Sequence, residues 1–121
     1  MNVKTISAEK AHTLLRTDPG TILVCAYEQE EEFRQNDLQG AISLSEFRRR
    51  IDSFSKHGDV IFYCACPHDD AAMKQAEKYK KRDFLNAQVL KGGVNAWKSR
   101  GYALVGTQVI PVDERRGGNV R

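Results

Sequence analysis

Long apolar runs are absent from this chain of 121 residues. No stretch approaches the ~20 consecutive apolar residues that a helix needs to cross a bilayer. The opening MNVKTISAEKAHTLL also lacks the basic region followed by an apolar region that marks a secretion signal. The sequence therefore predicts a protein with no membrane span, and we expect it to be cytoplasmic.

Cysteine is also scarce. The chain has three cysteines, Cys25, Cys64 and Cys66, and an odd number does not fit a framework of paired disulfides. Proteins of the cytoplasm, moreover, usually keep their cysteines reduced. We therefore expect thiols rather than structural bridges, and Cys25, inside an apolar run, is most simply a core residue.

A continuous basic surface is the third absence. The net charge is only +3, and the basic residues fall in short runs such as residues 48–50, while residues 28–32 are mostly acidic. A nucleic-acid surface needs a broader basic stripe with interleaved aromatic residues. The sequence predicts no nucleic-acid partner, and solvated helix faces are the simplest interpretation of the charged runs.

The composition that remains is that of one globular domain. Hydrophobic residues make up 40% of the chain and charged residues 29%, and no internal repeat is visible. Apolar periodicity ends near Gly106. We expect residues 1–106 to form the domain and residues 107–121 to form a flexible C-terminal tail.

Hydrophobic periodicity predicts strands that alternate with helices. The expected strands are residues 3–6, 21–27, 41–44, 60–63 and 87–90. The expected helices are one capped by Ser7 that ends near Arg16, one over residues 30–36, one capped by Ser45, and two over residues 70–81 and 94–100. This alternation indicates an α/β fold with a mainly parallel sheet.

The most informative stretch is VIFYCACPHDDAAMK at residues 60–74, where a strand passes through Cys64 into a helix. Ligands collect at the carboxyl ends of parallel strands, and Cys64 lies at such an end. Amides at the start of a helix lack intrahelical partners, and the helix dipole favours negative charge there. Both features favour the thiolate, the nucleophilic form of cysteine. We predict a reactive and accessible sulfur at Cys64.

The residues of this junction leave several interpretations open. Cys64 can also be a small buried residue that finishes a strand. Cys66 can carry a second sulfur, form a short disulfide with Cys64, or be a spectator thiol. His68 can supply positive charge or a proton, or be an exposed loop residue. Asp69 or Asp70 can cap the helix. We expect no metal, because the spacing of Cys64, Cys66 and His68 is unusual for zinc and no fourth ligand is evident.

Three segments together have the pattern of a known family. EF at residues 32–33 and LQGA at residues 38–41 resemble its E-F-x-x-G-H-I-P-G-A segment. YC at residues 63–64, with the loop into an Ala-rich helix, resembles its active-site strand and loop. LKGGVNAW at residues 90–97, followed by GY, is close to its L-x-G-G-x-x-A-W…G-Y ending. Over roughly residues 5–105 the chain resembles a single-domain rhodanese of the rhodanese-like sulfurtransferase family.

The resemblance implies both a fold and a reaction. The implied fold has three layers, with a mainly parallel sheet of about five strands and helices on both faces. The implied active-site loop is Cys64, Ala65, Cys66, Pro67, His68 and Asp69, with Asp70 beside it. By analogy, Cys64 takes sulfane sulfur from thiosulfate or a persulfide donor, holds it as a persulfide, and passes it to a thiol acceptor. Loop amides stabilise the anionic sulfur, and no cofactor is implied.

The chain departs from the family pattern where charge matters. Glu28 stands where many members have an arginine, although the arginines at residues 48–50 can replace that charge. Pro67 stands where glycine is common and has no N–H to offer. Asp69 and Asp70 add negative charge beside the thiolate. Thiosulfate, a dianion, should therefore bind poorly, and a less charged persulfide should bind better.

These departures support a second hypothesis, a rhodanese-fold module that binds a partner or senses oxidation without turnover. A third, a phosphatase of the related cysteine-loop type, is disfavoured. Its loop needs an arginine to bind phosphate, and residues 64–81 contain none.

Overall fold

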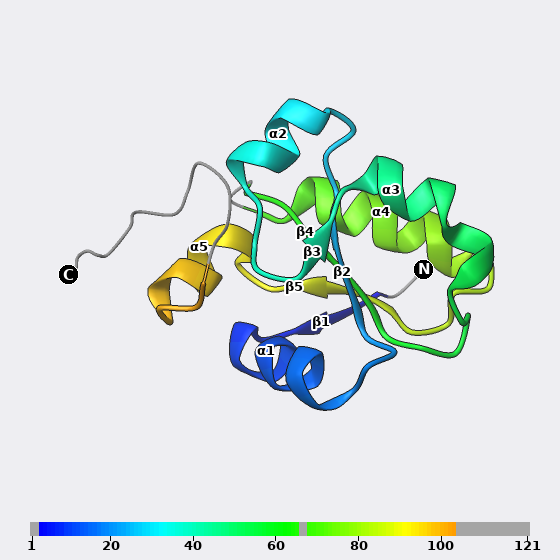
Figure 1. Ribbon diagram of the computed structural model, residues 1–121, viewed down its shortest axis with the longest axis horizontal. Helices are drawn as coiled ribbons and strands as arrows, with labels where there is room; N and C mark the ends of the chain where they lie inside the picture. Colours follow the sequence, from blue (N-terminus) through cyan, green and yellow to red (C-terminus); the bar gives the residue numbers. More distant parts are fainter. Residues whose placement is uncertain (1–2, 66–67, 104–121) are drawn as a thin grey trace.

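Five parallel strands form one sheet in the order β1-β5-β4-β2-β3 (Figure 1). The computed structural model describes residues 3–65 and 68–103. The strands are β1 (Lys4–Ile6), β2 (Ile22–Cys25), β3 (Ala41–Ile42), β4 (Val60–Tyr63) and β5 (Ala87–Leu90). All four pairings between neighbouring strands are parallel. The predicted α/β fold is therefore confirmed, and β4, which leads to Cys64, lies at the centre of the sheet.

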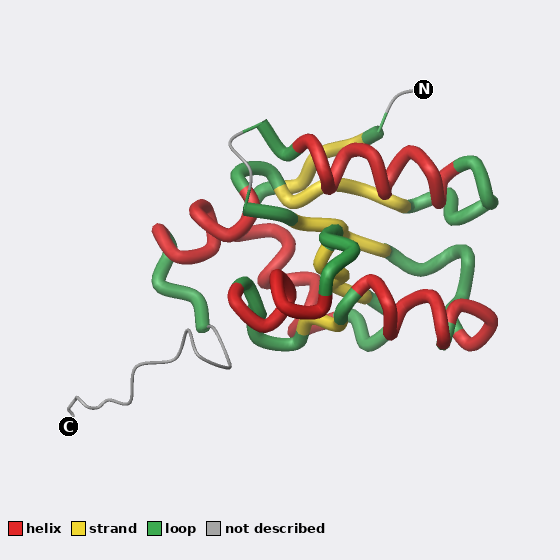
Figure 2. The backbone as a smooth tube through the Cα atoms, turned by 90° about the horizontal axis from the view of Figure 1, so that it is seen from above, coloured by secondary structure: helices red, strands yellow, loops and turns green. Residues whose placement is uncertain are grey.

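Helices cover both faces of this sheet. They are α1 (Ala8–Thr17), α2 (Glu30–Gln35), α3 (Leu44–Arg49), α4 (Asp70–Lys80) and α5 (Gly93–Ser99), with a short 3-10 helix, η1 (Ile51–Ser53), after α3. α1 and α5 pack on one face, and α3 and α4 pack on the other (Figure 1). Figure 2, which looks onto the second face, shows α3 and α4 running along the strands. The result is three layers with two separate cores.

The central strand shows how alternation fills both cores. Val60, Phe62 and Cys64 face α3 and α4, whereas Ile61 and Tyr63 face α1 and α5. All five side chains are buried. A strand covered on both faces has apolar residues at consecutive positions because successive side chains point to opposite faces. This is why VIFYC reads as a continuous apolar run.

The helix after β3 begins earlier than predicted. Ser7 caps α1 as expected, since its Oγ accepts from the Lys10 amide at 3.1 Å. Ser43, rather than Ser45, caps α3, and its Oγ accepts from the Glu46 amide at 3.0 Å. The prediction was wrong because Leu44 was read as the last strand residue. Ser43 and Glu46 have the spacing of a capping box, and Leu44 is buried from the first turn of the helix.

The last described residues are fixed to the rest of the domain. The carbonyl of Ala103 accepts from the Trp97 indole N–H at 2.8 Å and from the Gln39 amide at 3.1 Å. The predicted tail, residues 107–121, lies outside the described residues. In residues 3–65 and 68–103, no helix has the length and apolar character to cross a membrane.

Candidate active site

Cys64 lies at the carboxyl edge of the sheet, directly after β4 and between the ends of β5 and β2. It packs in the same core cluster as Ala72 and Ala76 of α4. Cys64 and the first turns of α4 therefore belong to one core, in line with the predicted strand–loop–helix junction.

The sulfur itself differs from the prediction of an accessible thiol. Cys64 is 0% exposed, and it is disulfide-bonded. Its side chain continues the alternation of β4 and so points into the core beneath α4 instead of toward solvent. A free thiolate at Cys64 therefore requires reduction of this disulfide.

The turn before α5 packs directly on the backbone of Cys64. The Val94 amide donates to the Cys64 carbonyl at 3.1 Å. A Cβ on Gly93 would lie 1.9 Å from that carbonyl oxygen, and Gly93 also has a φ of +50°. Only glycine fits such a close approach with a left-handed backbone. The GG pair found in the sequence thus positions the cysteine.

Asp69 occupies the N-cap position of α4 but does not cap the helix. Its side chain makes no cap hydrogen bond, and its Oδ2 accepts from the Gly92 amide at 3.1 Å instead. Its Oδ1 is buried and has no partner in the described part of the chain. The residue has a φ of 59°, in the left-handed region, which turns the carboxylate away from α4 and toward the α5 turn. The predicted capping role of Asp69 is therefore wrong, and its carboxylate leaves the first amides of α4 uncapped.

Tyr27, which follows β2, makes a hydrogen bond to the start of the predicted active-site loop. Its hydroxyl oxygen accepts from the Ala65 amide at 2.9 Å. Tyr27 follows β2 by two positions, and Ala65 follows Cys64 directly. The hydroxyl thus holds the loop where it leaves β4, and it occupies an amide that would otherwise be available to an anionic sulfur.

An arginine of another element does reach this edge, where the chain has Glu28 in place of the arginine of the family pattern, but its charge is already paired. Arg48 of α3 donates to both carboxylate oxygens of Glu28, at 3.0 and 3.2 Å, and its Nε donates to the Tyr79 hydroxyl at 3.3 Å. These bonds lower the pKa of Glu28 and raise the pKa of Arg48. The Gln75 amide also donates to Glu28, at 3.4 Å. The pair adds little net positive field near Cys64.

Cys25, the other described cysteine, lies away from Cys64. Cys25 is buried on the α1 and α5 face, opposite to Cys64. Burial raises the pKa of its thiol to about 11. The prediction of a core cysteine is confirmed.

Tyr63, which belongs to the same core cluster as Cys25, fixes the loop after α2. Its hydroxyl donates a hydrogen bond to the Asn36 carbonyl at 2.6 Å. Burial raises the pKa of Tyr63 as well.

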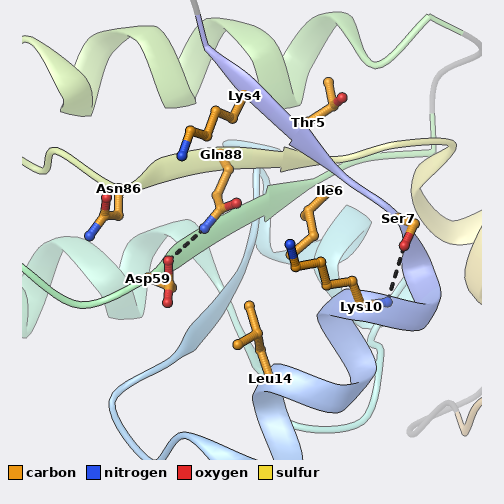
Figure 3. A pocket seen from close by; sticks show the side chains of 9 residues that line it. All are labelled: Lys4, Thr5, Ile6, Ser7, Lys10, Leu14, Asp59, Asn86 and Gln88. Atoms are coloured by element: carbon orange, nitrogen blue, oxygen red, sulfur yellow. Dashed lines mark hydrogen bonds between the residues drawn. The ribbon is translucent and has the colours of Figure 1, made fainter.

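Two cavities lie at opposite edges of the sheet. One, of 290 Å³, lies beside Tyr27 at the carboxyl edge. The other, of 370 Å³, lies at the amino edge between β1 and α1 (Figure 3). In the second cavity Gln88 donates to Asp59 at 2.8 Å. The lining of this cavity includes Asp59 and Asn86, which directly precede β4 and β5, whereas Cys64 directly follows β4. The cavity and Cys64 therefore lie at opposite ends of the strands.

The family model of the rhodanese-like domain matches residues 7–100. The chain belongs to the rhodanese-like family. The resemblance drawn from the three sequence segments is therefore confirmed, and the sheet and helices described above are those of a rhodanese-like domain. No curated protein matches the chain.

Solved structures of several proteins share this fold at low sequence identity. The Alr3790 protein from Anabaena sp. is 22% identical, with 84% of this chain and 81% of that chain covered and a TM-score of 0.69. The BH2092 protein from Bacillus halodurans is 22% identical, with 86% and 77% covered and a TM-score of 0.72. A rhodanese-related protein from Thermoplasma volcanium is 18% identical, with 84% and 97% covered and a TM-score of 0.65. Likeness at this level establishes the fold alone.

Within this rhodanese-like domain, the predicted loop is described only in part. Ala65 is half-buried and held by Tyr27, and the His68 side chain is exposed. Asp70 is exposed at the first position of α4. Cys66 and Pro67 lie outside the described residues.

Sequence reasoning missed the contacts that other elements make with this loop. Tyr27 had been read only as the end of an apolar strand, and Gln75 as part of a helix. One signal was available for Gln75: it lies three positions after Ala72 and one before Ala76, so a helix places it toward the inner side of α4. In the structure it is only 4% exposed. A polar side chain buried at that level needs a hydrogen-bond partner.

Proposed function

We propose that this rhodanese-like domain is a sulfurtransferase that carries sulfane sulfur as a persulfide of Cys64. The observation that carries the proposal is that Cys64 shares a core cluster with Ala72, in the first turn of α4, while the N-cap residue Asp69 makes no side-chain cap hydrogen bond to that helix. Because the Asp69 side chain binds the Gly92 amide instead, it does not compete for the first amides of α4. Those amides and the helix dipole favour an anion at this position.

The reaction proceeds through two transfers of one sulfur atom. After reduction, the Cys64 thiolate attacks the outer sulfur of a donor persulfide, R–S–SH. The S–S bond of the donor breaks, R–S⁻ leaves, and Cys64–S–SH forms. An acceptor thiolate then attacks the outer sulfur, which regenerates the Cys64 thiolate and releases the acceptor persulfide. Sulfane sulfur is conserved in both transfers, and no cofactor is required.

The charges near Cys64 favour a persulfide donor over thiosulfate. The Asp69 carboxylate lies at the loop, and its buried Oδ1 has no partner in the described residues. Arg48 is paired with Glu28. A dianion thus meets the Asp69 carboxylate, while the Arg48 guanidinium is already engaged by Glu28. A persulfide, which carries less charge, meets a smaller repulsion.

The alternative is a module that binds a partner or senses oxidation without turnover. The burial of Cys64 and its disulfide favour this second function. A sensor requires only that Cys64 change between its oxidised and reduced forms, whereas an enzyme must also accept and release sulfur repeatedly.

Sulfur loading distinguishes the two functions. The protein is reduced, freed of reductant, and incubated separately with thiosulfate and with a low-charge persulfide donor. Mass spectrometry then measures the addition of one sulfur atom. The sulfurtransferase loads from the persulfide donor and loses loading in Cys64→Ser, while Cys25→Ser still loads. No loading from either donor would favour the sensor, and loading that survives Cys64→Ser but fails in Cys66→Ser would move the carrier to Cys66.

A further inference from the structure

The cavity beside Tyr27 borders the core cluster that contains Cys64, the proposed sulfur carrier. Its volume is 290 Å³, and it is lined by Ala26, Tyr27, Glu28, Gln29, Glu32, Ala71, Lys74 and Gln75. Ala26, Tyr27 and Ala71 also belong to, or pack against, the core cluster that contains Cys64. The Tyr27 hydroxyl binds the amide of Ala65, the residue after Cys64. A small molecule in this cavity is therefore separated from the active-site loop by a single side chain.

The cavity has one available charge of each sign. Glu28 also lines it, but that carboxylate is bound by Arg48 through two hydrogen bonds. Glu32 and Lys74 are exposed, and neither forms an ion pair within residues 3–65 and 68–103. They come from different elements, α2 and α4. A ligand that carries both an ammonium and a carboxylate matches this arrangement.

Gln75 adds an independent indication of a ligand at this cavity. It is 4% exposed and lies in the cavity wall. Its amide nitrogen donates to Glu28, while its Oε1 is buried with no partner in the described part of the chain. An unpartnered buried carbonyl is costly, and an N–H donor from a ligand or from water would satisfy it after a small shift of the side chain.

We propose that this cavity binds the acceptor of the reaction, and that the acceptor is a small α-amino-acid thiol. Glu32 binds its ammonium group and Lys74 its carboxylate, so that the thiol points toward Cys64. This inference rests on the proposed sulfurtransferase function. The thiolate attacks the outer sulfur of Cys64–S–SH, the persulfide S–S bond breaks, Cys64 leaves as a thiolate, and the amino-acid persulfide carries the proton away.

Four thiols of similar size test the assignment of charges. L-Cysteine carries both groups, cysteamine only the ammonium, 3-mercaptopropionate only the carboxylate, and 2-mercaptoethanol neither. The measurement is the second-order rate constant for discharge of persulfide-loaded protein, followed by mass spectrometry. For each thiol the variant is compared with the wild type, so differences in intrinsic thiol reactivity cancel.

Each variant has its own expected pattern. Glu32→Gln slows discharge by L-cysteine and cysteamine, and Lys74→Gln slows discharge by L-cysteine and 3-mercaptopropionate. The expected decrease is about two- to fivefold for each lost pairing, the range typical of exposed ion pairs. Discharge by 2-mercaptoethanol stays unchanged in both variants. Glu31→Gln and Lys81→Gln, which remove exposed charges outside the cavity, leave all four rate constants unchanged.

The possible failures are distinguishable. If Cys64 loads no sulfur, the proposed function fails, and this inference fails with it. If loading is normal but Glu32→Gln and Lys74→Gln change all four rate constants equally, or change none, the amino-acid site alone is refuted. The amino-acid site alone is also refuted if Glu31→Gln and Lys81→Gln produce the pattern expected of Glu32→Gln and Lys74→Gln.

Discussion

The replacement Gly93→Ala tests whether the α5 turn holds Cys64 in place. The added Cβ would lie 1.9 Å from the Cys64 carbonyl oxygen and 3.0 Å from its carbonyl carbon. Both neighbours are backbone atoms, so rotation of a side chain cannot relieve the overlap. The start of α5 must move away from β4, and the hydrogen bond from the Val94 amide to Cys64 is lost.

The expected loss of stability has two parts. The left-handed φ costs an alanine about 1–2 kcal/mol, and the lost hydrogen bond costs about 0.5–1.5 kcal/mol. We therefore expect Gly93→Ala to lower the free energy of unfolding by about 1.5–3.5 kcal/mol. A domain with ordinary stability of about 5–15 kcal/mol remains folded after such a loss.

Gly40→Ala is the matched control. Gly40 also has a positive φ, +87°, but a Cβ there meets nothing within 4 Å among the described residues. It should therefore show the cost of the backbone conformation alone. Urea unfolding followed by circular dichroism under reducing conditions measures both variants, and sulfur loading is then measured where both are folded. Equal losses of stability in the two variants, with loading retained in Gly93→Ala, would refute the positioning of Cys64 by this turn.

Three further predictions concern charge and burial. Asp69→Asn removes the carboxylate near the loop and should raise the rate of loading from thiosulfate, relative to a persulfide donor, by about five- to tenfold; an unchanged ratio would show that Asp69 does not select the donor. The Glu28–Arg48 pair is exposed, so a double-mutant cycle with Glu28→Gln and Arg48→Met should give a coupling below about 1 kcal/mol. Because the pKa of Glu28 is lowered in the folded state, this coupling is present above the ordinary pKa of 4.5 and disappears as the pH falls through the lower folded value; a coupling that persists in strong acid would contradict this. The pKa of Cys25 is raised from 9.0 to about 11, so its contribution to stability is full below pH 9.0 and declines as the pH rises toward 11. Cys25→Ser should flatten this decline of stability with pH. Iodoacetamide should not label Cys25 in the native protein at neutral pH.

Local signals were sufficient for the elements that this sequence predicted well. The apolar run over residues 60–63 predicts a strand, and the structure confirms it, because both faces of β4 are covered and each face requires apolar side chains. Ser7 was read as a helix cap because its Oγ needs only the amide of Lys10, three residues later. The boundary at Ser43 was missed, since Leu44 fits a buried strand as well as a buried helix position when its neighbours in space are unknown.

The sequence by itself determined the order of strands and helices, the family, and the place of Cys64 between a strand and a helix. Each of these depends on residues that are near one another in the chain. Only the tertiary structure decided what surrounds the cysteine. Asp69 binds Gly92, Tyr27 binds Ala65, and Arg48 is bound by Glu28, across separations of 23, 38 and 20 residues. No periodicity or local spacing encodes such contacts, because they arise only when the parallel strands bring the loops that follow them to one edge of the sheet.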